Sequence, residues 1–181
     1  MGKGTLYGVG VGPGDPELVT LKAIRTIEAC RVVVAPRART GSSLALSIVR
    51  ANVDLTCHEV VEVPFAMAGE DDARDARRTD AAALVVSRLE QGLDVAMPTL
   101  GDPAIYSTFQ RIAAAVRGEG FTVRQVPGVP SFCAALREAG VLERTRLVSN
   151  CGRPDELVLR RLDAPDVPDK LGYFSTAVVL P

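Results

Sequence analysis

Five short apolar runs, rich in valine and each closed by glycine or proline, constrain the fold of this chain most strongly. They occupy residues 5–10, 31–36, 58–64, 93–98 and 121–127. Continuous apolar runs of this length, bounded by turn-forming residues, are typical of strands that are buried on both faces of a sheet. The sequence therefore predicts five buried β-strands.

Segments with helical periodicity separate these runs. In residues 16–29, for example, Leu18, Leu21, Ile24 and Ile27 recur at three-residue steps. The other predicted helices cover residues 43–51, 80–91, 105–117 and 131–139. Strands that alternate with helices favour an α/β fold with a parallel sheet and right-handed crossovers. In such sheets ligands bind at the carboxyl ends of the strands.

Composition limits the function classes. The chain has 181 residues, 47% of them hydrophobic, which supports one well-buried domain or one domain with a small appendage. Lys and Arg total 21 against 22 Asp and Glu, and aromatic residues make up only 4%, so charge and stacking both argue against a nucleic-acid partner. No segment has the pattern of a signal peptide or the roughly 18 apolar residues of a membrane span, and we expect a cytoplasmic protein.

Cysteine and histidine do not suggest a metal site. Cys30, Cys57, Cys133 and Cys151 are scattered without a Cys-x-x-Cys pair, and His58 is the single histidine. Free thiols fit the reducing cytosol, and a lone histidine without ligand partners is more often structural. We therefore expect no metal cofactor.

The loop after the first run, YGVGVGPGDPE at residues 7–17, has an unusual concentration of glycine and proline. Its spacing fits neither the dinucleotide fingerprint nor the P-loop, because Pro13 stands where a third glycine would be needed and no Gly-Lys-Ser/Thr follows. Asp15 can cap a helix that has Pro16 in its first position. Gly12 and Gly14 would let a ligand approach the backbone, although a plain strand-to-helix turn remains an alternative.

Two further glycine-containing loops follow the fourth and fifth runs. They are TLGDPAIYSTF at residues 99–109 and VPGVPSFCAAL at residues 126–136. Asp102 could cap a helix beginning near Ile105, or turn its carboxylate toward a cationic or hydroxyl-bearing ligand. Three hydroxyl groups follow it, on Tyr106, Ser107 and Thr108.

Two segments fall outside the alternating pattern. Residues 69–80 carry mixed charge and are interpreted as a solvated face or a mobile loop. After Gly140 the sequence predicts one short helical stretch, a loop rich in proline and aspartate, and a last strand with the sequence YFSTAVVL. This tail is too short for an independent domain, and its strand could complete the first sheet or pair with another chain.

Together, GVGVGPGDPELVTLKAIRTIEAC, TLGDPAIYST and VPGVPSFCAAL resemble the tetrapyrrole (corrin/porphyrin) methylase family, the S-adenosylmethionine-dependent methyltransferases of cobalamin and sirohaem synthesis. The segments PRARTGSSLALSIV and YST and the tail containing VSNCGRPDELVLRRLD are most similar to the precorrin-2 C20-methyltransferase group. The resemblance implies methylation of precorrin-2 at C20 in cobalamin biosynthesis. Alternatives are a cobalt-factor II C20-methyltransferase and a non-catalytic remnant that binds the donor or a tetrapyrrole.

The resemblance also implies a two-domain fold, a donor site between the domains and a homodimer. Residues 1–140 would form the N-terminal domain. Residues 141–181 would be a truncated C-terminal domain, because the family's second domain normally lies between the helix ending near Gly140 and the SNCG tail, and here residues 141–145 join these two segments directly.

The site residues implied by the resemblance lie in the three loops. Donor-binding residues would be Pro13, Gly101, Asp102, Ile105, Tyr106, Ser107, Thr108, Pro130 and Ser131. The opening loop, with Gly12, Gly14 and Asp15, would face the tetrapyrrole. Arg37 and Arg39 could bind its carboxylates, although two solvated arginines are an equal alternative. A base for the C20 proton could be Asp15, Tyr106 or solvent.

Overall fold

The computed structural model describes residues 2–37, 41–64, 71–105, 107–138, 144–149, 157–159 and 175–179. Within residues 71–79, and at 145, 148, 149 and 175–179, only the backbone is described. The chain divides into two compact units, Met1–Ser131 and Phe132–Pro181. We describe each unit by itself. The predicted boundary between residues 140 and 141 stays a prediction.

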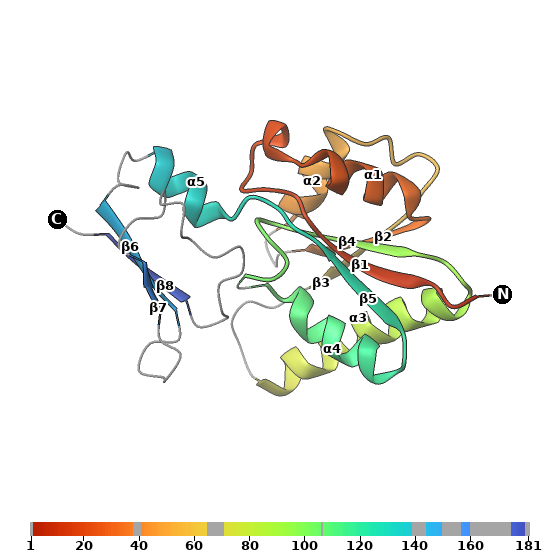
Figure 1. Cartoon of the computed structure of the whole chain (residues 1–181). Helices are drawn as coiled ribbons and strands as arrows, with labels where there is room; N and C mark the ends of the chain where they lie inside the picture. Colours follow the sequence, from red (N-terminus) through yellow and green to blue (C-terminus); the bar gives the residue numbers. More distant parts are fainter. Residues whose placement is uncertain are drawn as a thin grey trace. The chain divides into compact units, whose positions relative to one another are not determined.

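The first unit contains a five-stranded parallel sheet, which confirms the predicted fold class (Figure 1). Its strands follow the spatial order β3-β2-β4-β1-β5. Their bounds are Thr5–Gly10 for β1, Val32–Arg37 for β2, Glu59–Pro64 for β3, Val95–Thr99 for β4 and Thr122–Val126 for β5. Each lies within two residues of a predicted run. The central strands β1, β2 and β4 are mostly buried, whereas β3 and β5 lie at the edges of the sheet and are mostly part-exposed, so the prediction of burial is wrong for these two strands.

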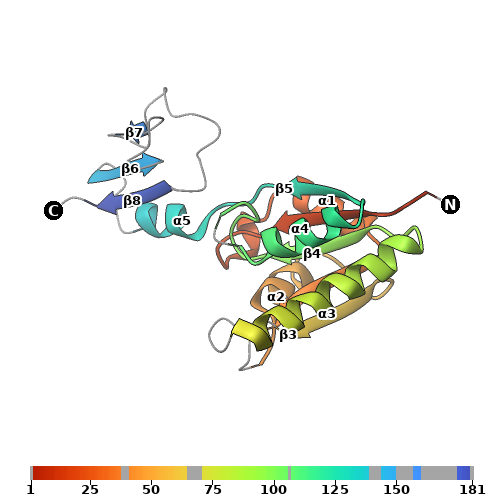
Figure 2. The same cartoon turned by 90° about the horizontal axis from the view of Figure 1, so that it is seen from below.

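Helices cover both faces of this sheet. One layer contains α1 (Leu21–Ala29) and α2 (Leu44–Arg50), and the other contains α3 (Asp71–Glu90) and α4 (Phe109–Gly118). Figure 1 shows α1 and α2 above the sheet, and Figure 2 is viewed from the side of α3 and α4. The first unit is therefore a three-layer α/β structure.

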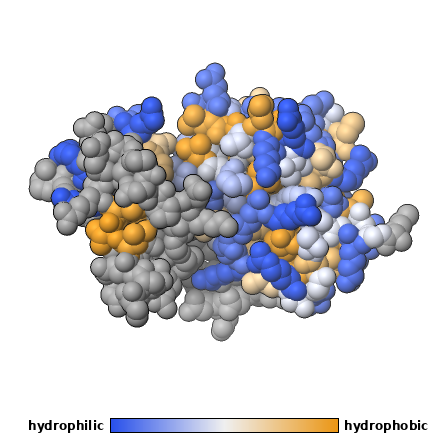
Figure 3. All heavy atoms as spheres, viewed as in Figure 1, coloured by the Kyte–Doolittle hydropathy of each residue, from blue (hydrophilic) through white to orange (hydrophobic). Residues whose placement is uncertain are grey.

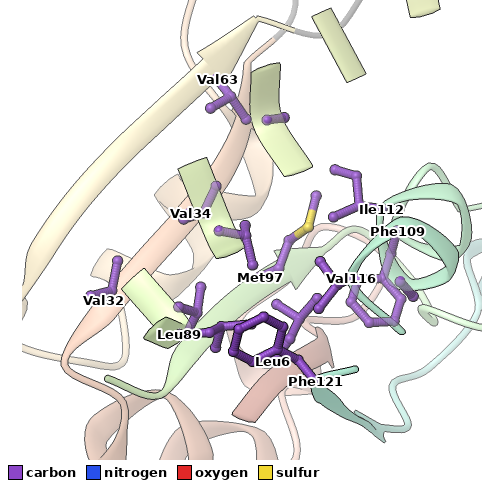
Figure 4. Close-up of a cluster of buried hydrophobic side chains, with 14 residues drawn as sticks. Leu6, Val32, Val34, Val63, Leu89, Met97, Phe109, Ile112, Val116 and Phe121 are labelled. Atoms are coloured by element: carbon purple, nitrogen blue, oxygen red, sulfur yellow. The ribbon is translucent and has the colours of Figure 1, made fainter. Parts of the chain in front are cut away.

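Successive strand residues pack into opposite layers. In β2, Val32 and Val34 join the core on the α3 and α4 side, whereas Val33 and Ala35 join the core on the α1 and α2 side. Figure 4 shows the first of these cores. Phe109 of α4 has no exposed surface there, and burial of such a side chain contributes about 1.5–3 kcal/mol.

The first predicted helix is interrupted. A short 3-10 helix, η1 (Pro16–Leu18), precedes α1, and Asp15 accepts a hydrogen bond from the backbone N–H of Glu17 at 2.9 Å. Thr20 then caps α1 through a 3.1 Å bond from the N–H of Ala23. Capping by Asp15 is confirmed. The prediction of one continuous helix over residues 16–29 is wrong, because η1 ends at Leu18 and a new helix, capped by Thr20, begins at Leu21.

The mixed-charge segment is helical where the structure describes it. Residues 71–80 belong to α3, so the expectation of a mobile loop is wrong over that range, while residues 69 and 70 lie outside the described residues. Alanine and arginine have high helix propensity, and opposite charges three or four positions apart in the sequence favour a helix. The helical pattern was missed because this part has few apolar residues.

The second unit contains helix α5 (Ser131–Glu138), which begins at the last residue of the first unit, and a separate antiparallel sheet. This sheet has the order β7-β6-β8, with β6 at Thr145–Ser149, β7 at Leu157–Leu159 and β8 at Ser175–Val179. The predicted last strand is present as β8. It pairs with β6 and does not complete the first sheet. The tail also contains two strands that the sequence did not predict, β6 and β7.

No helix in the described ranges is long and apolar enough to cross a membrane.

Candidate functional site

Three loops meet at the carboxyl edge of the first sheet. β1 lies between β4 and β5 and runs parallel to both. The loops that leave Gly10, Thr99 and Val126 are therefore neighbours, although they are far apart in the sequence. These are the three loops that the sequence singled out.

The first two loops are joined through their backbones. Gly101 donates its N–H to the carbonyl oxygen of Gly12 at 2.7 Å, and Gly12 donates to Gly101 at 3.3 Å. Both residues have positive φ, 79° at Gly12 and 71° at Gly101, which residues with side chains rarely adopt. Val11 adds a 3.0 Å bond to the carbonyl oxygen of Thr99. The glycines therefore serve the contact between the loops.

The third loop touches the other two at Gly128. A Cβ atom on Gly128 would collide with the carbonyl oxygen of Gly101 and would lie 2.8 Å from the carbonyl carbon and Cα of Gly10. A Cβ on Gly10 would lie 2.5 Å from the nitrogen of Gly128. The backbones are thus in direct contact, and only glycine fits at either position.

Asp102 links the second and third loops. Its Oδ1 accepts the N–H of Ala104 at 2.7 Å, and its Oδ2 accepts the N–H of Gly128 at 3.0 Å. The expectation that Asp102 caps a helix near Ile105 is wrong, because α4 begins only at Phe109. Ser107 occupies that local role, since its Oγ accepts the N–H of Phe109 at 3.1 Å.

The remaining predicted donor residues are placed as follows. Pro130 and Ser131 lie beside Gly101, where a Cβ would stand 3.7 Å from the Cα of Pro130 and 3.5 Å from the nitrogen of Ser131. Ile105 is exposed, and Thr108 precedes α4 without a side-chain bond to it. Pro13 is partly buried, and Tyr106 lies outside the described residues.

The predicted substrate residues that the structure describes lie in the loop after β1 and at the end of β2. Gly14 has a φ of 152°, and the position that its Cβ would occupy has no atom within 4 Å. The carboxylate of Asp15 is engaged in capping η1. Arg37 is exposed at the carboxyl end of β2, and Arg39 lies outside the described residues.

Asn52 is a supporting residue that sequence reasoning missed. Its Nδ2 donates to the carbonyl oxygens of Pro16 and Ile48, each at 3.1 Å, and thereby ties η1 to α2. The opening loop is in turn held against η1, because a Cβ on Gly12 would lie 3.1 Å from the carbonyl oxygen of Leu18. No local pattern could have revealed a contact between residues 36 positions apart.

The groups of the first unit whose pKa is clearly shifted lie near the amino ends of the strands, away from the three loops. Burial, together with the nearby Asp94, raises the pKa of the Cys30 thiol to about 12. The hydrogen bond from Arg88 lowers the pKa of Glu59, and backbone and side-chain bonds from Thr56 lower that of Asp54. These groups precede or begin β2 and β3, so they are separate from the three-loop edge.

Comparison with known proteins agrees with this arrangement. The sequence model of the tetrapyrrole (corrin/porphyrin) methylases matches residues 5–166. Cobalt-precorrin-2 C(20)-methyltransferase of Salmonella typhimurium is 33% identical over 168 residues, which cover 90% of this chain and 70% of that protein. Precorrin-2 C(20)-methyltransferase of a Sinorhizobium species is 30% identical over 78% of this chain and 60% of its own length.

The structural likeness concerns the fold. Uroporphyrin-III C-methyltransferase of Thermus thermophilus, solved as a complex with S-adenosylhomocysteine, superposes with a TM-score of 0.56 at 22% identity, covering 86% of this chain and 87% of the other. Because the family match extends over most of the chain and the fold agrees, this protein belongs to the tetrapyrrole (corrin/porphyrin) methylase family and is a methyltransferase by class.

Proposed function

We propose that this chain transfers a methyl group from S-adenosylmethionine to C20 of precorrin-2 in cobalamin biosynthesis. The names of the two relatives support the ring position, and the YST and SNCG segments agree with it. The observation that supports a donor site here is the backbone contact among the loops of Gly12, Gly101 and Gly128 at the carboxyl edge of the sheet. Ligands of open α/β sheets bind at this edge.

The junction fits a ligand that is held mainly by the backbone. Glycines at the loop contacts leave no side chains between the strand ends, and the open space beside Gly14 lets a ligand reach the main chain. The donor, when bound, supplies a methyl group that is already activated by its positive sulfur. The protein therefore needs no nucleophilic side chain and contributes chiefly alignment, worth up to about 7–11 kcal/mol in favourable cases.

We place the donor against the loop segments that contain Pro13, Gly101, Asp102, Ile105, Tyr106, Ser107, Thr108, Pro130 and Ser131. In the reaction, the substrate carbon forms a bond to the methyl group as the carbon–sulfur bond breaks, and C20 then loses one proton. Asp15, Tyr106 or solvent is the candidate acceptor of that proton. Since Asp15 already caps η1, its carboxylate would have to serve both roles.

Charge and apolar surface at the same edge fit a polycarboxylate macrocycle. Arg37, together with Arg39, would bind substrate carboxylates in bidentate geometry. Leu44, Leu100 and Ile105 are 54%, 42% and 39% exposed in the segments that follow β2 and β4, and they offer apolar contacts to the ring. Figure 3 shows further apolar surface among hydrophilic groups over the segment that joins β1 to α1.

A second candidate substrate is the cobalt-containing form of the same ring. The Salmonella relative is named for cobalt-precorrin-2, whereas the Sinorhizobium relative is named for precorrin-2. Both candidates share the ring position. We further propose that the chain forms a homodimer, which sedimentation of the purified chain would test, and that it acts in the cytoplasm.

Calorimetric titration of the purified chain with S-adenosylhomocysteine tests the donor site. Saturable binding is expected, and methyl transfer to precorrin-2 and cobalt-precorrin-2 is then compared. Arg37→Ala should raise the KM for the tetrapyrrole and leave the affinity for S-adenosylhomocysteine unchanged. Binding without turnover on either ring would identify a non-catalytic binding protein, and no binding by the folded chain would refute the proposal.

A further inference from the structure

The two carboxylate oxygens of Asp102 bond to different loops. Oδ1 accepts the N–H of Ala104 at 2.7 Å and closes a turn within the loop after β4. Oδ2 accepts the N–H of Gly128 at 3.0 Å and reaches the loop after β5, 26 residues away. Hydrogen bonds to a charged acceptor are roughly twice as strong as neutral ones. A single side chain thus ties the two loops together.

The bond to Gly128 is placed at the tightest point of the junction. Gly128 is in backbone contact with both Gly10 and Gly101, and Gly101 directly precedes Asp102. Pro130 and Ser131 follow in the same loop and lie beside Gly101. Loss of the Oδ2 bond would therefore let the third loop move away from the other two.

The geometry points to Asp102 as a positioning residue, whose carboxylate clamps the loop after β5 to the loop after β4 so that their backbone groups hold the donor. This inference rests on the proposed donor site at these loops. It differs from a direct role, in which the carboxylate itself binds the donor and the loops keep their places without it. The two roles predict different rates of hydrogen exchange for the Gly128 amide when Asp102 is replaced.

Asp102→Asn tests the clamp with almost no change in shape. An asparagine side chain has one carbonyl oxygen and one NH2 group, but it faces two backbone N–H donors and can satisfy only one of them. Asp54→Asn is the matched control. Asp54 also accepts an N–H two residues along, from Thr56 at 3.0 Å, and it lies in the loop between α2 and β3.

Hydrogen exchange of the Gly128 amide, followed by NMR in the full chain without ligand, measures the clamp directly. We expect Asp102→Asn to speed this exchange by at least about tenfold, because a charge-assisted bond is lost. Amides of β2 serve as an internal reference for global stability, and the change in the Gly128 rate is measured relative to theirs in each variant. Because asparagine can still turn its carbonyl oxygen toward Gly128, Asp102→Ala, which has no side-chain acceptor, completes the test. Unchanged Gly128 exchange in both variants would overturn the clamp.

Titration with S-adenosylhomocysteine then connects the clamp to binding. Asp102→Asn should weaken binding by about tenfold or more, a loss comparable with that of one such bond, and Asp54→Asn should bind like the wild type. Faster Gly128 exchange with unchanged affinity would overturn the positioning role, and weaker affinity with unchanged exchange would show direct contact. If the wild type does not bind, the proposed donor site fails, and the exchange rates alone still decide whether Asp102 clamps the loops.

Discussion

Replacing Gly128 with alanine is expected to destabilise the first unit and to open the junction of the three loops. The added Cβ would collide with the carbonyl oxygen of Gly101 and stand 2.8 Å from two backbone atoms of Gly10. The φ of Gly128 lies outside the left-handed region, so alanine meets no dihedral penalty there. The variant therefore tests the close approach of the backbones alone.

The size of the effect follows from what the methyl group meets. Extra atoms in a packed region cost about 1–3 kcal/mol when side chains can move aside. Backbone atoms of Gly10 and Gly101 have less freedom, because both belong to or adjoin the central strands β1 and β4. We therefore expect a loss of at least about 2 kcal/mol in the free energy of unfolding.

Urea unfolding followed by circular dichroism measures this loss, with Gly118→Ala as the control. Gly118 ends α4, has no atom within 4 Å of its potential Cβ and also lacks a positive φ. Alanine is expected to be neutral or to stabilise there by up to about 1 kcal/mol, since it favours helix. Equal stability of Gly128→Ala and the wild type, with S-adenosylhomocysteine binding retained, would refute the proposed contact.

Three further predictions concern the core and two titrating groups. Phe109→Ala removes a fully buried ring and should cost about 3–5 kcal/mol in urea unfolding; a loss below about 1 kcal/mol would contradict its place in the core. Because the pKa of Cys30 is raised from 9.0 to about 12, its thiol should resist iodoacetamide near pH ~8 while exposed Cys57 reacts, as mass spectrometry would show. The same shift means that this thiol's contribution to stability is lost as pH rises from 9.0 toward 12, since the unfolded thiol ionises first. Arg88→Gln should raise the lowered pKa of Glu59 in an NMR titration, and no change would exclude the ion pair. The stabilising effect of that pair is present above the ordinary pKa of a glutamate and is lost as the pH falls through the lowered value.

The success of the sequence predictions varied with the kind of interaction involved. Valine-rich runs predicted all five parallel strands within two residues, because β-branched residues favour extended backbone locally and the central strands are mostly buried. The helix limits were less well predicted. Thr20 caps a new helix inside the range 16–29, and α3 extends through a charged segment that has few apolar residues.

The sequence also identified the three loops, because glycine and proline at strand ends are local signals. It did not predict the partners of Asp102, whose bond to Gly128 depends on two segments 26 residues apart. Asn52 gave no signal, since its partner Pro16 is even more distant along the chain. Assignments of donor and substrate residues came from family resemblance and stay predictions.

The sequence by itself determined the strands of the first sheet, most of the helices and the identity of the loops, because short-range periodicity and turn chemistry are encoded in neighbouring residues. Only the tertiary structure decided which loops touch. The order β3-β2-β4-β1-β5 places β1 between β4 and β5, and this order results from packing of the whole sheet. That packing brings Gly10, Gly101 and Gly128 into backbone contact and makes glycine necessary at positions where the sequence showed only a turn.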